Sequence, residues 1–374
     1  MDFNFNEEQQ MVYDSTKKFF EKETSGTLLR ELMEDDKGYS PEVWKKMAEL
    51  GWMGLLFKEE YGGFEGSFLD FALILEGMGK SAMPSPFLST VILTGLIIQD
   101  NGSEELKKEY LPKIAEGECI STLAFLGRKG LYSKSELELE AKQVNGGYRI
   151  SGAASFVPYA HVADNILCAA KTTDSEGVTL FILDGKAAGI ETINLHSISG
   201  KGVDCLVNFK DVQATPAQIV GEAGKGWEYI EAQWPKVAVA LSCECVGGMD
   251  RVMEMTLNHV NERIQFGKPL SALQVVQHMC VDMAMKLETS RHTAHYAAWQ
   301  VNEGLDCTKE AAIAKSWCGE AFKVVTKIGH QLTGGIGFSE EFDLFLYTRN
   351  AKKLELLFGD GSFQRAIVAD NIGL

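Results

Sequence analysis

The residues best suited to bind an anion lie in the segment ERIQFGKPL, residues 262–270. Arg263 supplies a rigid fork of hydrogen-bond donors, and Phe266 supplies a flat face on which a planar ligand can stack. The glycine and proline of the segment indicate a turn, and Gln274 opens the helical pattern that follows. The same residues are also typical of a capped turn between two helices that carries an ordinary salt bridge. The segment alone therefore leaves an anion site and a plain turn both open.

A second candidate is the segment QLTGGIGF, residues 331–338, which follows a long helical pattern. Its closely spaced glycines indicate positive φ angles or the close approach of a ligand to the backbone. Backbone N–H groups of such a turn can hold a phosphate group. The segment is not a P-loop, because the GxxxxGK[ST] pattern is absent and no strand precedes it. A glycine-rich end of a helix remains the alternative interpretation.

The third candidate is Asp360, which stands between two glycines in the segment FGDGSF, residues 358–363. A carboxylate in a loop between helices can act as a base that is held near a ligand. It can equally be the N-cap of the last helix, because Asp is a preferred N-cap residue. The pattern by itself leaves both roles open.

Composition and charge narrow the classes of function. The chain has 374 residues with 36 Lys and Arg against 52 Asp and Glu, a formal charge of −16. Such a charge disfavours binding to nucleic acid and to anionic membrane surfaces. The 8 cysteines are scattered singly and predict neither a disulfide framework nor a zinc site. Since residues 1–8 are acidic and no apolar run is long enough to span a bilayer, we expect a cytoplasmic protein without a metal.

Three zones of different periodicity must position the candidate residues. Residues 1–117 carry apolar residues at helical spacing, and residues 223–374 return to long helical patterns. Residues 118–222 alternate with period two between turn signals such as those at 145–147, 173–177 and 200–202. We therefore predict an α+β fold with an N-terminal helical domain, a middle β domain that is a barrel or sandwich, and a C-terminal helical bundle.

The ordered set of motifs resembles the acyl-CoA dehydrogenase family of flavoproteins. RxQFGKPL, QxxGGxGF and YxRxAK occur in this order, and the segments at 50–63 and 111–118 match as well. The resemblance therefore spans essentially the whole chain. It implies an N-terminal α-helical domain (1–117), a middle β-barrel domain (118–222) and a C-terminal four-helix bundle (223–374). It also implies FAD as cofactor, an acyl-CoA thioester as substrate, and an electron acceptor such as an electron-transfer flavoprotein.

The resemblance also assigns residues to the cofactor. In the family, the Arg and Phe of the RxxFG motif contact FAD that a neighbouring subunit mainly binds, and the QxxGG turn packs on its adenosine diphosphate part. Because these contacts cross a subunit interface, the resemblance implies a homo-oligomer or a heteromer with a related dehydrogenase subunit. The cofactor-binding residues implied for this chain are Arg263, Phe266, Gln274, Gln331, Gly334 and Gly335.

The sequence departs from the family pattern at three places. Residues 125–133 read FLGRKGLYS instead of the TEPxxGSD signature, and residues 156–158 read FVP instead of W-[IV]-[ST]. Phe358 stands at the position of the usual catalytic Glu, and Val237 stands at the alternative base position. Asp360 is then the carboxylate of this loop and the candidate catalytic residue, two positions after the family's Glu.

Three functions follow from the resemblance and its departures. The leading expectation is an FAD-dependent acyl-CoA dehydrogenase, or a component of one. The FGD loop resembles a side branch of the family whose members occur as partners in two-component dehydrogenases, so a non-catalytic partner subunit is the second. The third is other flavin chemistry on the same fold, such as oxygenation or elimination.

Overall fold

The computed structural model describes residues 6–172, 177–198 and 200–374. The predicted turn at 173–177 falls mostly outside the described residues, as do the first five residues of the acidic N-terminus. The chain forms two compact units, each built from segments that are far apart in sequence. Unit 1 contains Met1–Leu29, Phe68–Met83 and Ala238–Leu374, and unit 2 contains Arg30–Ser67 and Pro84–Val237. The three-domain division at residues 117 and 222 follows the order of the chain and stays a prediction.

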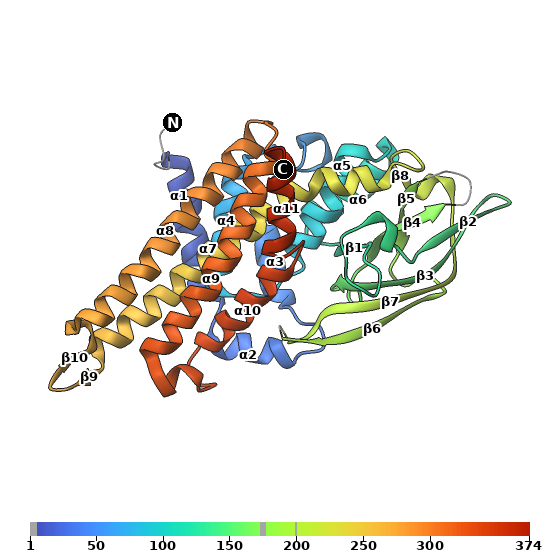
Figure 1. Cartoon of the computed structure of the whole chain (residues 1–374). Coiled ribbons are helices and arrows are strands. Elements are labelled where there is room, and N and C mark those ends of the chain that lie inside the picture. Colours follow the sequence, from blue (N-terminus) through green and yellow to red (C-terminus); the bar gives the residue numbers. More distant parts are fainter. Residues whose placement is uncertain (1–5, 173–176, 199) are drawn as a thin grey trace. The chain divides into compact units, whose positions relative to one another are not determined.

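Unit 1 is a bundle of helices. Helix α9 packs against α8, α10 and α11, and α4 packs against α1 and α8 (Figure 1). A short hairpin of β9 (Ile264–Gln265) and β10 (Lys268–Pro269) joins α7 to α8. The helices of unit 1, some of which begin or end in unit 2, are α1 (Glu7–Glu23), α2 (Gly26–Glu34), α4 (Phe68–Ser81), α7 (Gly226–Glu262), α8 (Gln274–Asn302), α9 (Thr308–Thr333), α10 (Leu344–Leu356) and α11 (Gly361–Asn371).

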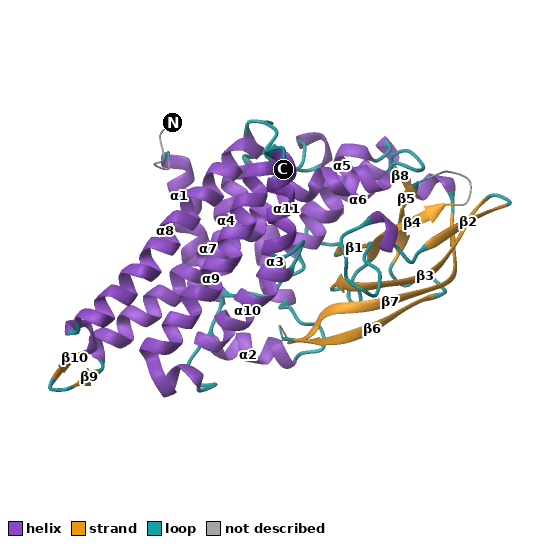
Figure 2. Cartoon of the chain, in the orientation of Figure 1, coloured by secondary structure: helices purple, strands orange, loops and turns teal. Residues whose placement is uncertain are grey.

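Unit 2 contains the sheet that the period-two zone predicts (Figure 2). The sheet has eight strands in the order β6-β7-β3-β2-β4-β5-β8, and β1 pairs in parallel with β4. The fold class is thus confirmed, and the predicted β domain corresponds to this sheet. The strands are β1 (Ser121–Ala124), β2 (Glu140–Val144), β3 (Gly147–Pro158), β4 (Asn165–Thr172), β5 (Val178–Asp184), β6 (Ile190–Ser197), β7 (Gly200–Ala214) and β8 (Ile219–Val220).

Local sequence signals explain where the helices of unit 2 begin. These helices are α3 (Pro41–Glu49), α5 (Ile97–Asn101) and α6 (Glu104–Ala115), and a π-helical turn, η3 (Ser89–Leu96), precedes α5. Ser40 Oγ accepts a hydrogen bond from the Val43 N–H at 3.3 Å, and Ser103 Oγ accepts one from Leu106 at 3.3 Å. Side-chain oxygens at these N-cap positions satisfy backbone donors that the helix cannot pair itself. Further short turns of unit 2 are η1 (Trp52–Gly54), η2 (Glu59–Tyr61), η4 (Lys134–Glu136) and η5 (Pro216–Gln218), and those of unit 1 are η6 (Leu270–Ala272) and η7 (Gly334–Phe338).

Helices α4 and α7 cross at two glycines inside unit 1. A Cβ atom on Gly79 would lie 1.9 Å from the carbonyl oxygen of Glu244, and one on Gly247 would lie 1.8 Å from that of Glu76. Real side-chain carbons do not approach backbone oxygens so closely, so the two helices meet backbone to backbone.

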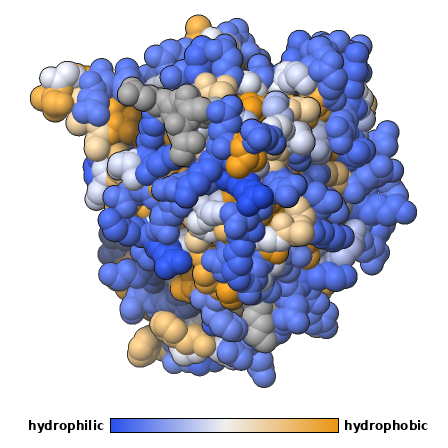
Figure 3. All heavy atoms as spheres, turned by 90° about the vertical axis from the view of Figure 1, so that its right-hand side faces the viewer, coloured by the Kyte–Doolittle hydropathy of each residue, from blue (hydrophilic) through white to orange (hydrophobic). Residues whose placement is uncertain are grey.

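One face of the surface can be described by its hydropathy. The face seen in Figure 3 is mostly hydrophilic, and its hydrophobic residues lie in small separate groups. Among the described residues, no helix combines the length and apolar character that crossing a bilayer requires. The same residues contain no group of three or more His, Cys, Asp or Glu side chains arranged to hold a metal ion.

Candidate functional site

The hairpin after α7 presents Arg263 and Phe266 to the outside of unit 1. Phe266 and Gly267 have φ angles of 53° and 76°, so the two-residue turn is left-handed throughout. A left-handed conformation strains a phenylalanine backbone, yet the ring is 86% exposed. In the described part of the chain, the exposed Arg263 forms no salt bridge. The structure therefore does not contain the alternative considered for this segment, a turn between helices in which Arg263 forms an ordinary salt bridge.

The glycine-rich segment forms the end of α9 and the turn η7. Gly334 has a φ of 63° and its N–H bonds to the His330 carbonyl, so the helix-end interpretation is correct for this residue. A Cβ atom on Gly335 would meet nothing within 4 Å, and its φ is not left-handed. Neither conformation nor space inside unit 1 requires glycine there, so the open surface at Gly335 suits a group that approaches from outside.

The residues assigned to the cofactor gather at one end of unit 1. Gln274 is the first residue of α8, and Gln331 lies in the last turn of its neighbour α9. Since α8 and α9 are packed and joined by a short connection, they run antiparallel, and these two ends lie together (Figure 1). The hairpin with Arg263 leads directly into α8. The side chains of Gln274 and Gln331 are both exposed.

In unit 2, the FVP segment ends strand β3 at an irregularity. The pairing of β3 with β7 shifts register between Ala154 and Val157, and Phe156 has a φ of 55°. Such a bulge changes the direction of a side chain, and the Phe156 ring is 47% exposed. The ring lies next to the loop at Gly130, where an added Cβ would be 3.1 Å from it. Pro158 accepts a hydrogen bond from Thr122 Oγ1 at 2.6 Å through its carbonyl.

Four aromatic side chains form a cluster in unit 2 that the sequence analysis missed. Tyr132 lies 6.0 Å from Phe125 and 5.9 Å from Trp234, ring centre to ring centre. Trp227 completes the cluster, 6.4 Å from Phe125 and 5.9 Å from Trp234. These separations are typical of favourable edge-to-face packing. The sequence feature that indicates this cluster is the spacing of Trp227 and Trp234, which puts both rings on one face of a helix.

The structure shows what the loop before α11 does. Asp360 Oδ1 accepts hydrogen bonds from the N–H groups of Ser362 at 3.0 Å and Phe363 at 2.9 Å, so Asp360 is the N-cap of α11. The Phe358 side chain is 6% exposed, and Val237 is fully buried. Neither position of the family's base carries a carboxylate, and the role of Asp360 as a base stays a prediction.

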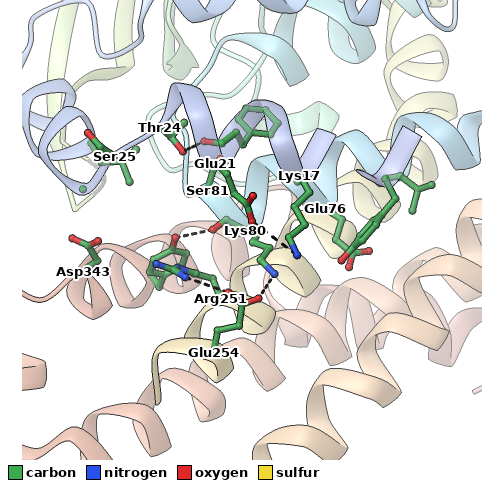
Figure 4. A pocket seen from close by; sticks show the side chains of 17 residues that line it. Lys17, Glu21, Thr24, Ser25, Glu76, Lys80, Ser81, Arg251, Glu254 and Asp343 are labelled. Carbon is green, nitrogen blue, oxygen red and sulfur yellow. Dashed lines mark hydrogen bonds and ion pairs between the residues drawn. The ribbon is translucent and has the colours of Figure 1, made fainter. Parts of the chain in front are cut away.

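Unit 1 also contains a cavity of about 200 Å³ between α1, α4, α7 and α10 (Figure 4). Lys80 Nζ lies 2.6 Å from Asp250 Oδ2 and also pairs with Glu254. Arg251 Nη1 donates to Glu254 Oε2 at 3.2 Å. The cations at this cavity are thus paired with carboxylates, and none of the residues assigned to FAD lines it.

A buried carboxylate continues this network. Glu76 is 3% exposed and lies 2.9 Å from His295 Nε2 and 3.4 Å from Arg291 Nε. Burial alone would raise the pKa of Glu76, but the hydrogen bond with His295 and the charge of Arg291 hold it below its ordinary value. Sequence analysis missed this network, because its members are far apart in the chain.

Comparisons with known proteins agree with the fold and the motifs. Residues 6–118 match the family model for the N-terminal domain of acyl-CoA dehydrogenases, and residues 224–373 match the C-terminal domain. The short-chain specific acyl-CoA dehydrogenase of Clostridium acetobutylicum is 26% identical over 379 residues, which cover 100% of both chains. The structure of butyryl-CoA dehydrogenase from Megasphaera elsdenii has a TM-score of 0.93 at 26% identity, covering 100% of both chains. The structure of PigA with FAD and proline has the same values.

The chain belongs to the acyl-CoA dehydrogenase family. It is an FAD-dependent oxidoreductase that acts on CH–CH groups, by itself or as a component of the dehydrogenase. The residues present fit the cofactor. Arg263, which is exposed and forms no salt bridge among the described residues, and the open glycine turn suit a diphosphate, and the exposed Phe266 ring suits a planar ring system.

Proposed function

We propose that this chain is a subunit of an acyl-CoA dehydrogenase that contributes Arg263, Phe266 and the turn at Gly334 and Gly335 to FAD at a subunit interface. The observation that carries this proposal is the strained, 86% exposed Phe266 beside Arg263. Strain of this kind persists where the surroundings or a partner require it. The Phe266 ring buries little of its surface against unit 1, which supports a contact with a group outside the chain.

The chemistry divides between cofactor and protein. FAD, when bound, accepts the hydride from the β carbon of the acyl thioester. The chain's own residues bind the cofactor, orient the substrate and exclude water. The acyl-CoA substrate and an electron-transfer flavoprotein as acceptor are proposed from family membership. A cytoplasmic location is proposed from the sequence, because the cysteines are scattered singly and the first residues are acidic.

Asp360 is the base that we propose within this chain. It is the carboxylate of the loop, it is half-buried, and the bonds that hold it involve Oδ1. The second oxygen is left to accept a proton. Against this, two backbone N–H groups hold the carboxylate in the position of an N-cap.

A second candidate function is a partner subunit that completes the FAD site of a related subunit carrying the base. The observation that favours it is the buried Phe358 at the position of the family's catalytic Glu. In this arrangement the chain supplies cofactor contacts, and the α proton is removed by a carboxylate of the related subunit.

Two measurements on the purified chain test the proposal. The absorbance of oxidised flavin tells whether the chain holds FAD alone. Reduction of an artificial electron acceptor with butyryl-, octanoyl- and palmitoyl-CoA tells whether it oxidises thioesters. Flavin with turnover supports a complete dehydrogenase, and activity only after a related subunit is co-expressed supports the partner function. No flavin and no activity in either preparation would contradict both.

A further inference from the structure

Lys315 on α9 carries an ammonium group that is buried among backbone carbonyls. Its side chain is 1% exposed. Nζ donates to the carbonyl oxygen of Glu355 at 3.0 Å and to that of Gly359 at 3.3 Å. The carboxylate of Glu355 is engaged elsewhere, by Lys323 and Lys352, each at 2.7 Å. The Lys315 ammonium group therefore donates hydrogen bonds to backbone carbonyls and does not pair with the Glu355 carboxylate.

These two carbonyls stand on either side of one turn. Glu355 lies in the last turn of α10, and Gly359 lies just before α11. The final carbonyls of a helix have no partner within it and carry partial negative charge. One ammonium group satisfies both acceptors and thereby ties the end of α10 to the turn at residues 357–361.

The same turn is fixed from a second side. Gln364 Nε2 donates to the Phe358 carbonyl oxygen at 2.7 Å, and both side chains are buried. Phe358 is left-handed, with a φ of 56°, and Gly359 follows with 91°. A Cβ atom on Gly359 would lie 2.2 Å from the Phe363 ring. A strained backbone that neighbouring side chains hold in this way marks a conformation that is required.

A lysine is a costly residue to bury at this place. Desolvation lowers the pKa of Lys315, although Cys245, Glu355, Cys318 and Asp360 act in the opposite direction. A methionine would fill a similar volume without that cost, but it would leave both carbonyls without a donor. Burial of Lys315 thus lowers the stability of the fold, while its hydrogen bonds fix the backbone of the turn.

We propose that Lys315 is a positioning residue for the turn at 357–361. Its ammonium group sets the backbone at Gly359 and so determines which side chain of the turn faces the reacting carbon of the substrate. The inference rests on the proposed function, in which this turn occupies the place of the family's catalytic Glu.

The test compares Lys315→Met with Lys323→Met in the flavin-loaded protein. Lys323 is a matched control, because it lies on the same helix and contacts Glu355 through the carboxylate instead of the carbonyl. Amide hydrogen exchange of residues 357–364 reports the turn directly. The change in flavin absorbance on adding butyryl-CoA or octanoyl-CoA reports the substrate side.

We expect exchange in residues 357–364 to become at least tenfold faster in Lys315→Met, and the thioester-induced flavin change to lose most of its amplitude. Lys323→Met should leave both within about twofold of the parent. If Lys315→Met cannot be purified, Lys315→Leu, which also has no donor for the two carbonyls, replaces it with the same expectation.

Unchanged exchange at 357–364 would overturn the positioning role and leave the proposed function standing. Faster amide exchange with an unchanged flavin response to the thioester would also overturn the positioning role, because the turn would then be loosened without an effect at the flavin. If the parent protein gives no flavin response to any thioester, the proposed function fails, while the exchange data still report whether Lys315 fixes the turn.

Discussion

Asp360 and Phe363 are joined by a hydrogen bond of 2.9 Å, in which the backbone N–H of Phe363 donates to Oδ1 of the carboxylate. The bond fixes the start of α11 and holds the candidate base at the same time. Two functions of one carboxylate can be separated by substitution, since a cap needs an oxygen acceptor and a base needs an ionisable group.

Asp360→Asn should therefore keep the cap and remove the base. We expect its melting temperature to stay close to that of the parent, whereas Asp360→Ala should lose about 1 kcal/mol of stability. If Asp360 is the base, Asp360→Asn should lower thioester oxidation by about a hundredfold or more with flavin content retained. Activity within a few-fold of the parent would remove Asp360 as the base.

Phe358→Glu should install a carboxylate at the position of the family's base. We expect this variant to gain or increase oxidation of acyl-CoA thioesters, measured with an artificial electron acceptor. Phe358→Gln is the matched control, because it has the same shape as Glu and cannot accept the proton at neutral pH. Equal rates for the two variants would show that the turn does not face the reacting carbon.

Arg263→Ala should weaken FAD binding by roughly tenfold or more, since a charge-assisted bond to phosphate is worth about 1.5–3 kcal/mol. Flavin content after dialysis measures the loss. Lys268→Ala is the control, because Lys268 is an exposed cation on the same hairpin. Full flavin retention in Arg263→Ala, or an equal loss in Lys268→Ala, would sink the assignment of Arg263.

Acid should destabilise unit 1 through Glu76. Its pKa is lower in the folded protein than its ordinary value of 4.5, so the unfolded state binds the proton more readily. The stabilisation is present above pH 4.5 and is lost as the pH falls through the lower folded pKa. Glu76→Ala should lower the free energy of unfolding near neutral pH, because Arg291 and His295 lose this buried partner, although Arg291 keeps Glu288 and Asp250.

Urea unfolding of the parent and of Glu76→Gln between pH 3 and 7 measures this dependence. The variant should be less stable at neutral pH and should lose less stability on acidification. Parallel curves for the two proteins would show that Glu76 is not the group that titrates.

Helix α8 should form part of a subunit interface. Val275, Val281 and Met285 are 64%, 54% and 62% exposed, which is unusual for apolar side chains repeated along one helix. We expect light scattering at micromolar concentration to give an oligomer, and Met285→Lys to shift it toward smaller species. Ala366→Lys, at an exposed position of α11, has the same charge change and is the control. A monomeric mass for the parent would contradict the prediction.

The sequence predicted local features better than long-range ones. Caps such as Ser40 and Ser103 depend on residues three positions apart, and the period-two zone reports the pleat of a strand. The candidate site at the hairpin could be proposed from the sequence, because one continuous segment contains Arg263 and Phe266. The contact of Glu76 with Arg291 joins residues 215 positions apart, and periodicity shows which face is buried without showing against what. The left-handed backbone conformation of Phe358 could not be predicted for a similar reason, since tertiary contacts hold the residue in it.

The crossing of α4 and α7 sets how the protein tolerates mutation. At Gly79 and Gly247 even a methyl group would collide with a carbonyl oxygen at less than 2 Å, so alanine would force the two helices apart. A saturation library scored only for soluble expression should therefore be depleted at both codons as strongly as at the core aromatic residues. Residue size at these two positions thus limits sequence drift, although neither glycine has a side chain that could take part in chemistry.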